Sequence, residues 1–358
     1  MKNRTVIVAL AAINAVSKNI VPKIGSHGAW GYTMPIPFDD LADELLLQID
    51  ERVRNHVSKV IVCSAQGDSY GKDSMFDLEK GQHKKRARPA IALATTDTGL
   101  VSRVNAQLPI VDDVFKIDAA CASGIKGLEV GMLMAANTDE LVMVLGVEYA
   151  TAPYIAFSFG SIFATCQSGN YLGPFDSNRT GFALGDGAGS IVICNEDTAR
   201  KLNLPIKAYL DSINFLTLPS DQPSQPSNLT ALTKFLADTL VKSNRQKTEF
   251  AFWDAHATAT TIGDQVEYEL FSSSGLDVPI SSFKGAIGHC LSASAIIEIV
   301  NAVEHLQKGI IPMNHRVETR MTQDDRIILS NETTNKKTFI KCSFGFGGRN
   351  GAAVITVV

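Results

Sequence analysis

The alternation of apolar, strand-like segments with amphipathic helical segments is the feature that most constrains the fold of this chain. Apolar side chains recur at helical spacing over residues 122–137, 229–240 and 293–307. This alternation predicts an α/β fold in which helices cover the faces of a sheet. The strand-like runs lie at residues 5–13, 59–64, 114–118, 140–147, 189–194, 250–254, 339–343 and 352–358.

The length and charge of the chain narrow the choice of architecture and of partner. Its 358 residues, 45% of them hydrophobic, are enough for two domains or for one larger α/β unit with a duplicated core. The net charge of -4 argues against a nucleic-acid-binding protein. The proline-rich segment 216–228 is either a linker between two halves or a surface loop, and the sequence leaves both interpretations open.

The cysteines and the apolar runs indicate the expected compartment. The six cysteines are scattered and form no CxxC pair, which argues against a zinc ribbon or a thioredoxin-type site. The segment 1–19 has a basic start and an apolar run, but no cleavage site of small residues follows, so we interpret it as a first strand. Because no run of about 18 apolar residues occurs, we expect no membrane span. The unpaired thiols favour a location in the reducing cytoplasm. We expect neither a metal nor another cofactor.

Cys121 lies in the segment DAACASG, at the point where a predicted strand ends and a helix begins. The positive end of the helix dipole and the unpaired backbone N–H groups there are expected to lower the pKa of a thiol and favour the thiolate. Two interpretations stay open at this point. Cys121 is either a nucleophile or a buried structural cysteine, which is the commoner role of a single cysteine.

Two histidines occupy similar junctions. His256 follows the predicted strand 250–254, and His289 follows a glycine-containing loop just before a helix. A lone histidine is more often a surface or core residue, but two such histidines together with Cys121 form a set that can carry out nucleophilic acyl transfer.

The segment SFGFGGRNG at 343–351 is a glycine-rich turn between two predicted strands. Glycine permits positive φ and close backbone approach. The turn is therefore either a tight hairpin or a loop that presents backbone N–H donors and changes the position of Phe346 when it moves.

Four segments, in this order, resemble the β-ketoacyl synthases of the thiolase-like superfamily. They are the cysteine turn 119–124, the stretch PFDSNRTGFALGDGAG at 174–189, residues 256–267 with KGAIGH at 284–289, and the turn 343–350. The second stretch is similar to the family signature PFDxxRxGFxxGEGAG, with Asp186 in place of glutamate. The similarity covers roughly residue 114 to the C-terminus.

The resemblance implies roles for the reacting groups. Cys121 corresponds to the nucleophile that accepts the acyl group. His256 and His289 correspond to the histidine pair that promotes malonyl decarboxylation and stabilises the enolate. Phe346 corresponds to the gating phenylalanine, and its backbone N–H together with that of Cys121 would form the oxyanion hole.

The resemblance also implies supporting residues. Lys284 corresponds to the lysine of the KxxxGH motif, and Glu298 lies where the family has its acidic partner. These two either tune the electric field at the histidines or form a buried ion pair that only fixes the helix. Thr258 and Thr260 correspond to hydroxyls that contact the pantetheine arm of the substrate.

Other polar residues of the motifs are expected to be structural. We predict that Asp176 and Arg179 form an ion pair that braces their loop, and that Glu267 anchors a loop. Ala257 and Ala259 stand where the family has other residues, glycine in the case of Ala257, and an extra methyl there would narrow the pantetheine tunnel.

The resemblance leaves three functions in competition. The first is an active condensing enzyme of fatty acid or type II polyketide synthesis. The second is a catalytically silent chain-length-factor subunit, suggested by a region before Cys121 that is shorter than usual, although such subunits usually lack the cysteine. The third and weakest is a thiolase, which has a single histidine and a second active-site cysteine.

The family also implies an architecture and partners. We expect a thiolase-like α/β fold with two similar halves, residues 1–210 and 211–358, in a five-layered α-β-α-β-α arrangement. We expect a homodimer, or a heterodimer with a second synthase-like chain, paired through the strand before Cys121. An acyl carrier protein would be the partner in catalysis. The basic run at 83–88 is either a solvated loop or its docking site.

Overall fold

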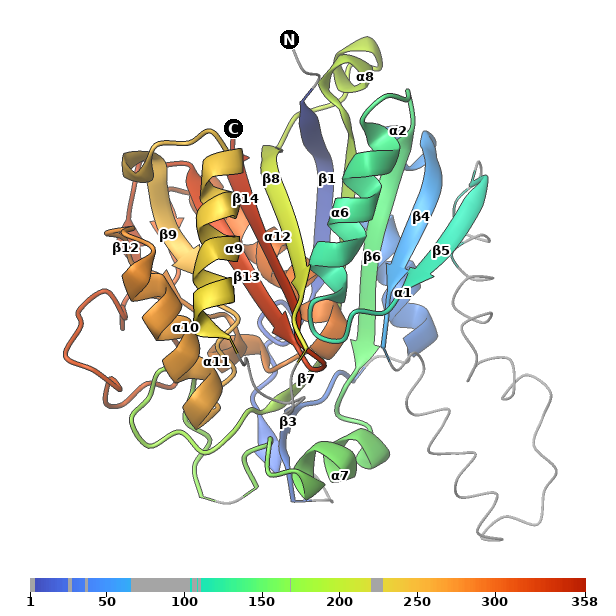
Figure 1. Ribbon diagram of the computed structural model, residues 1–358. Coiled ribbons are helices and arrows are strands. Elements are labelled where there is room, and N and C mark those ends of the chain that lie inside the picture. The colour runs from blue at the N-terminus through green and yellow to red at the C-terminus, as the bar shows by residue number, and fades with distance from the viewer. Residues whose placement is uncertain are drawn as a thin grey trace, which may run out of the picture.

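The apolar segments form strands and the amphipathic segments form helices in the computed structural model of the chain (Figure 1). The structure describes residues 4–24, 28–35, 38–65, 104, 108, 111–167, 169–219 and 228–358. The strands are β1 Thr5–Ile13, β2 Lys23–Ile24, β3 Trp30–Tyr32, β4 Val57–Cys63, β5 Asp113–Ile117, β6 Leu141–Tyr149, β7 Leu184–Asn195, β8 Ala208–Thr217, β9 Phe250–Asp254, β10 Ile280–Ser281, β11 Ile310–Ile311, β12 Glu332–Thr333, β13 Thr338–Gly345 and β14 Arg349–Val357. The α-helices are α1 Phe38–Leu47, α2 Glu51–Arg54, α6 Ser123–Ala135, α7 Pro153–Ser161, α8 Glu196–Lys201, α9 Leu229–Lys242, α10 Thr261–Ser273, α11 Lys284–Ile287 and α12 Ser294–Gln307. Two short 3₁₀ helices are η1 Lys247–Glu249 and η2 Leu291–Ala293.

The main sheet contains the same strand arrangement twice. One half has the order β5-β4-β6-β7-β1, and the other has the order β10-β9-β13-β14-β8. When the strands of each half are numbered along the chain, both orders read 3-2-4-5-1. The orientations also agree, because the first three strands of each order are parallel and the last two pairings are antiparallel. The expectation of two similar halves therefore has a topological counterpart.

The two halves meet edge to edge through a short antiparallel pairing of β1 with β8, in which Val6 pairs with Tyr209 and Ile7 with Ala208. The described part of the sheet is thus continuous across the two halves. The predicted boundary between residues 210 and 211 lies inside β8, and the division of the chain into domains at that residue stays a prediction.

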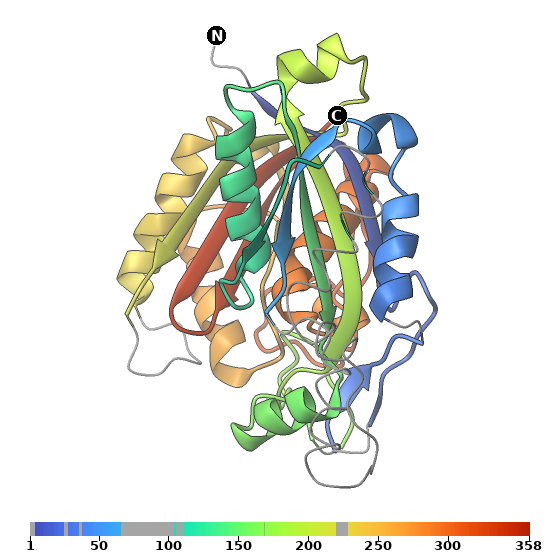
Figure 2. The same cartoon turned by 90° about the vertical axis from the view of Figure 1, so that its right-hand side faces the viewer.

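The helices form three layers around the strands. Helices α6 and α12 each contact strands of both halves and make up the central layer. Helix α1 packs on β1 and β7 on one outer side, while α9 packs on β8 and β14 on the other and also contacts α10. Figure 2 shows α9 and α1 at opposite sides of the molecule with the strands between them. This is the five-layered α-β-α-β-α arrangement that we expected.

The central layer is apolar because it is covered on both sides. Glycines in α6 allow this close packing, since a Cβ added at Gly124 would lie 3.0 Å from the Cβ of Ala295 in α12. Ten of the fourteen residues of α12 are buried, which explains why its sequence is so apolar at its start.

The predicted elements agree with the observed ones to within a few residues, and β9 matches at both ends. Strand β8 and helices α1, α7, α8 and α10 are among the elements that were not predicted. Strand β8 contains Asp211, Ser212 and Asn214 among its apolar residues, and α10 has a polar exposed face, so neither gave a clear pattern. Among the described residues, no helix combines the length and the apolar character needed to cross a membrane.

Candidate active site

Cys121 lies in the tight turn between β5 and α6. Ala120, just before it, has a φ of 50°, a left-handed conformation that side chains other than glycine rarely adopt. Two local hydrogen bonds hold this turn. The backbone N–H of Ala120 donates to the Asp118 carboxylate at 2.9 Å, and that of Ala119 donates to Ser123 Oγ at 2.8 Å. The strained turn directs the Cys121 thiol into a cavity.

The ionisation of Cys121 differs from the expectation. Burial raises the pKa of the thiol to about 12, although the charge of Lys284 acts in the opposite direction. The predicted lowering of the pKa by the helix N-terminus was therefore wrong for this chain. The physical reason is that the free-energy cost of removing a thiolate from water exceeds the stabilisation that the helix N-terminus provides. Cys121 stays protonated at neutral pH unless a neighbouring base accepts its proton.

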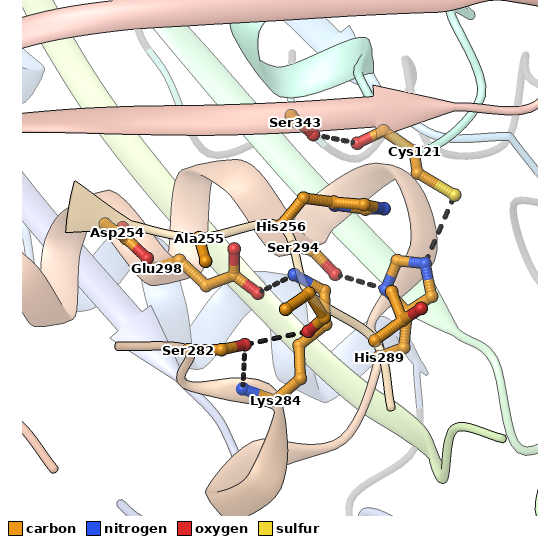
Figure 3. A network of polar contacts seen from close by, with 12 residues as sticks. Cys121, Asp254, Ala255, His256, Ser282, Lys284, His289, Ser294, Glu298 and Ser343 are labelled. Atoms are coloured by element: carbon orange, nitrogen blue, oxygen red, sulfur yellow. Dashed lines mark hydrogen bonds and ion pairs between the residues drawn. The ribbon is translucent and has the colours of Figure 1, made fainter. Parts of the chain in front are cut away.

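His289 is that neighbour. Its Nε2 atom lies 3.2 Å from Cys121 Sγ, and its Nδ1 atom lies 2.9 Å from Ser294 Oγ (Figure 3). Gly288, with a φ of 75°, lets the chain turn before the histidine, and Ser294 is the first residue of α12. The ring of Phe182 meets the imidazole edge-on at 5.2 Å. The imidazole is thus fixed at both nitrogens and on one side.

His256 lies beside His289 at the end of β9. The two ring centroids are 5.4 Å apart and the rings are nearly perpendicular, at 80°. Its backbone N–H and that of Ala257 donate to the two oxygens of Glu267, at 2.8 and 2.6 Å. Glu267 is therefore a loop anchor, as predicted. The Nδ1 atom of His256 is buried and has no hydrogen-bond partner among the described residues.

Both imidazoles are neutral at physiological pH. The pKa of His256 lies well below its usual value of 6.5 because of burial, and then because of the charges of Lys284, His289 and Lys341. The pKa of His289 is also well below 6.5, from burial and from the same two lysines. A neutral imidazole offers one N–H donor and one acceptor nitrogen, so each ring can either take a proton or donate a hydrogen bond.

Lys284 and Glu298 form the predicted pair. The Lys284 Nζ atom lies 2.6 Å from Glu298 Oε1, and both side chains are almost fully buried. The structure adds two residues to this pair that the sequence analysis missed, Lys341 and Asp254. A signal for Lys341 was present in the sequence, since it is a charged residue between Ile340 and Cys342 in the strand TFIKCSFG. Ser294 was also missed, and its hydroxyl gave no signal in the sequence.

Cys121, His256 and His289 line one cavity of about 270 Å³. Thr258 and Thr260 line it, with their hydroxyls 3.1 Å apart. Phe346 also lines it, and its ring meets that of Phe159 at 5.9 Å. Of the predicted site residues, those that line the cavity are Cys121, His256, His289, Thr258, Thr260 and Phe346. Lys284 and Glu298 lie behind the histidines.

The loop around Arg179 is braced in a different way from the one predicted. Arg179 pairs with Asp264, whose Oδ2 atom lies 3.0 Å from the guanidinium Nε. The Asp176 carboxylate instead accepts backbone N–H groups, from Asn178 at 2.7 Å and Glu318 at 2.7 Å among others. The predicted Asp176–Arg179 ion pair was therefore wrong. Asp176 is closer to Arg179 in the sequence, but the Asp264 carboxylate, from α10, reaches the Arg179 guanidinium across the loop.

Comparison with known proteins places this site in a family. The family described as "Beta-ketoacyl synthase, N-terminal domain" matches residues 47–199, and "Beta-ketoacyl synthase, C-terminal domain" matches residues 219–318. A 3-oxoacyl-[acyl-carrier-protein] synthase 2 from Coxiella burnetii is 28% identical over 261 residues, which are 68% of this chain and 61% of that protein.

Solved structures share the fold. One comes from the complex of a type II polyketide synthase acyl-carrier protein with its ketosynthase bound to the hexaketide. It has a TM-score of 0.85 at 17% identity, and the match covers 100% of both chains. The ishigamide ketosynthase/chain length factor has a TM-score of 0.83 at 17% identity, again over 100% of both chains. The fold is thus the thiolase-like fold that we expected.

The chain spans less than two thirds of the curated relatives that it matches first, from 16% of a mellein synthase to 61% of the Coxiella synthase. The two family matches together cover more than half of the chain, and they include the turn of Cys121 as well as both histidines. The chain therefore belongs to the β-ketoacyl synthase family.

Proposed function

We propose that this protein catalyses the decarboxylative Claisen condensation of an acyl thioester, held on Cys121, with a malonyl thioester carried by an acyl carrier protein. The observation that carries the proposal is the convergence of Cys121, His256 and His289 on one cavity of about 270 Å³. A thiol and two neutral imidazoles at one hollow are the groups that this reaction needs.

The first step is acyl transfer to Cys121. The thiol gives its proton to His289 Nε2, 3.2 Å away, and the sulfur attacks the carbonyl carbon of the acyl thioester. The bond from that carbon to the carrier sulfur then breaks, and the carrier thiolate takes the proton back from His289. Backbone N–H groups of Cys121 and Phe346 are proposed to hold the oxyanion, with Phe346 as the gate.

The second step forms the carbon–carbon bond. The malonyl thioester loses carbon dioxide, and the electron pair passes onto its carbonyl oxygen as an enolate. His256 and His289 are proposed to donate N–H hydrogen bonds to that oxygen, for which neutral imidazoles suit. The enolate carbon then attacks the carbonyl carbon of the acyl group on Cys121, the carbon–sulfur bond breaks, and the leaving Cys121 thiolate takes a proton from water to become the thiol again. Thr258 and Thr260 are proposed to contact the pantetheine arm.

The partners follow from the same family. We propose an acyl carrier protein as the substrate carrier, and a homodimer or a heterodimer with a second synthase-like chain. Strand β5 ends the order of the main sheet and its residues are partly exposed, which fits a pairing edge. The basic run at 83–88, suggested as a docking site for the carrier, lies outside the described residues. A cytoplasmic location also stays a proposal.

Acyl loading tests the function directly. The wild-type protein is incubated with acyl carrier protein bearing a short acyl chain, and its intact mass is measured. We expect one acyl adduct, which is absent in Cys121→Ala and present in the control Cys290→Ala, whose thiol is buried next to His289. With malonyl carrier protein added, the adduct should be converted into the β-ketoacyl product. A Cys121→Ala variant that elongates acyl chains at the normal rate would contradict the proposal.

The silent-subunit alternative predicts a different pattern. A chain-length-factor-type subunit takes no acyl group, yet restores condensation when co-expressed with a second synthase-like chain, even as Cys121→Ala. Detection of the acyl adduct on Cys121 decides against this alternative. A thiolase-type acyltransferase would transfer acyl groups without releasing carbon dioxide from a malonyl thioester.

A further inference from the structure

Four charged side chains are buried directly behind the two histidines. The ammonium group of Lys341, in β13, lies 3.0 Å from Asp254 Oδ1 and contacts Glu298 Oε2. It also lies 3.2 Å from the backbone oxygen of Ala255. Glu298 in turn contacts Lys284. None of the four side chains is more than about 1% exposed, and two ammonium groups alternate with two carboxylates.

This arrangement is costly, and packing alone does not require it. Removing an ion from water costs several kcal/mol, and a pair of well-packed apolar residues is often as stable as a buried ion pair. Strand β13 is apolar on both sides of Lys341, with Ile340 and Cys342 also fully buried. An apolar residue at position 341 would continue that pattern, so core packing does not account for the charge of Lys341.

The contacts of Lys341 converge on the segment that carries His256. Asp254 and Ala255 immediately precede His256, and the ammonium group binds a side-chain oxygen of the first and the backbone oxygen of the second. Glu298 is held between two ammonium groups, one on each carboxylate oxygen. A loss of Lys341 would release both the end of β9 and one side of Glu298.

The charge of Lys341 also acts on the imidazoles. Burial is the largest cause of the lowered pKa of His256 and of His289, and the positive charges of Lys284 and Lys341 lower it further. Lys341 itself stays charged. Burial opposes its charge, but Asp254 and Glu298 outweigh burial and raise its pKa. A permanent positive charge on β13 therefore acts on both histidines.

We infer that Lys341 is a positioning residue of this site, which fixes Glu298 and the chain segment before His256 and places a permanent positive charge close to both imidazoles. The role in catalysis rests on the proposed condensation, which needs neutral imidazoles as hydrogen-bond donors. The charge effect on the histidines does not rest on it.

The other groups that face the histidines come from several elements. Around Lys341 lie Asp254 at the end of β9, Glu298 of α12, Lys284 of α11 and Glu267 of α10. The thiol of Cys121 and the hydroxyl of Ser294 contact His289. Burial raises the pKa of Asp254 to about 7 and the charge of Lys341 opposes that rise, so a variant at position 341 also changes the charge of Asp254. A change in the titration of the histidines therefore reports on Lys341 together with the carboxylates that it binds.

Two readouts test the inference on the full chain. The first is the pH at which the imidazole Cε1–H resonances of His256 and His289 titrate, with ¹³C-labelled histidine and assignment by His256→Gln and His289→Gln. The second is the rate of malonyl-thioester decarboxylation against pH. In Lys341→Met the titration midpoints should rise. Decarboxylation should fall in proportion to the neutral fraction of the histidines. The fall approaches tenfold per unit of rise only at assay pH values below the variant's midpoints, and it should vanish at pH values well above them. Lys341→Arg, which keeps the charge, should hold the midpoints near those of wild type.

A matched control separates this effect from general damage. Ile340→Ala removes buried volume from the same strand without changing a charge, so it should lower stability and leave the midpoints unchanged. If Lys341→Met does not fold, Lys341→Gln removes the charge but keeps a hydrogen-bond donor for Glu298, and the same rise is expected. If neither folds, wild-type midpoints at or above pH 6.5 still overturn the inference, because the histidines would then lack the lowering that burial and the two lysine charges produce.

The outcomes distinguish the two proposals. Unchanged midpoints in a folded Lys341→Met or Lys341→Gln variant overturn the inference. A wild-type protein that does not decarboxylate malonyl carrier protein overturns the proposed function, while the histidine titration still tests Lys341.

Discussion

The Nε2 atom of His289 lies 3.2 Å from the Sγ atom of Cys121, although 168 residues separate them in the chain. Burial raises the pKa of this thiol to about 12, so the contact supplies the base that a protonated nucleophile needs. The proposed acyl transfer therefore requires a proton transfer between these two side chains, since the helix N-terminus does not lower the pKa of the thiol enough to replace it.

Removal of His289 should slow acyl loading of Cys121. We expect His289→Gln to lower the loading rate by about 10² to 10⁴-fold, the range typical of a lost general base. Stopped-flow or quenched mass spectrometry with acyl carrier protein measures the rate. Ser294→Ala, which removes the partner of Nδ1 but not the base, should lower it less. Equal loading by His289→Gln and wild type would show that another group accepts the proton.

The two buried histidines should make stability depend on pH. Their folded-state pKa values lie below the usual 6.5, so the unfolded chain binds protons first as the pH falls. Above pH 6.5 the two histidines are neutral in both states and do not lower the free energy of unfolding. Below pH 6.5 the free energy of unfolding decreases as the pH falls, by up to about 2.7 kcal/mol per pH unit for two groups.

Urea unfolding between pH 8 and pH 5 checks this dependence. Buried carboxyl groups act in the opposite direction, because burial raises the pKa of Asp186 to about 6 and that of Glu267 to about 7. The comparison is therefore made with a His256→Gln/His289→Gln double variant, in which the acid-side loss should be smaller. Parallel curves for the two proteins would contradict the prediction.

Ala259 should be improved by glycine. Its φ is 67°, a conformation that costs a residue with a Cβ about 1 kcal/mol. We expect Ala259→Gly to raise the free energy of unfolding by about 0.5 to 1 kcal/mol, measured by urea or thermal unfolding. Ala257→Gly is the matched control two residues earlier in the same loop. Since Ala257 is not among the positive-φ residues, glycine there should lower stability by a similar amount.

Gly345 should be required for the geometry of the nucleophile turn. A Cβ added there would lie 2.9 Å from the backbone oxygen of Ala119 and 3.1 Å from the backbone nitrogen of Cys121. Gly345→Ala should therefore push β13 away from the turn and lower acyl loading by about 10²-fold, the effect of a shift near 1 Å. Gly347→Ala is the control in the same hairpin. Its added Cβ meets no atom within 4 Å, so it should cost stability through its φ of 75° and leave loading closer to wild type.

Local sequence patterns determined much of the fold. Strand β9 and helix α12 have continuous apolar or helical spacing, and their ends follow from that spacing to within a residue. Strand β8 was missed because its polar residues interrupt the pattern, while its pairing with β14 and β1 determines its conformation. The repeated 3-2-4-5-1 order was invisible as well, since no periodic repeat marks it in the sequence.

The candidate residues for chemistry could be identified from the sequence alone. Cys121, His256 and His289 stand at junctions between strands and helices, and motif order together with junction type was enough to single them out. How these residues behave depends on the folded surroundings. The pKa of Cys121, the buried charges of Lys341 and Asp254, and the pairing of Arg179 with Asp264 depend on burial and on distances between segments far apart in the chain. Desolvation and Coulomb interactions are set by the three-dimensional surroundings, so local spacing does not encode them.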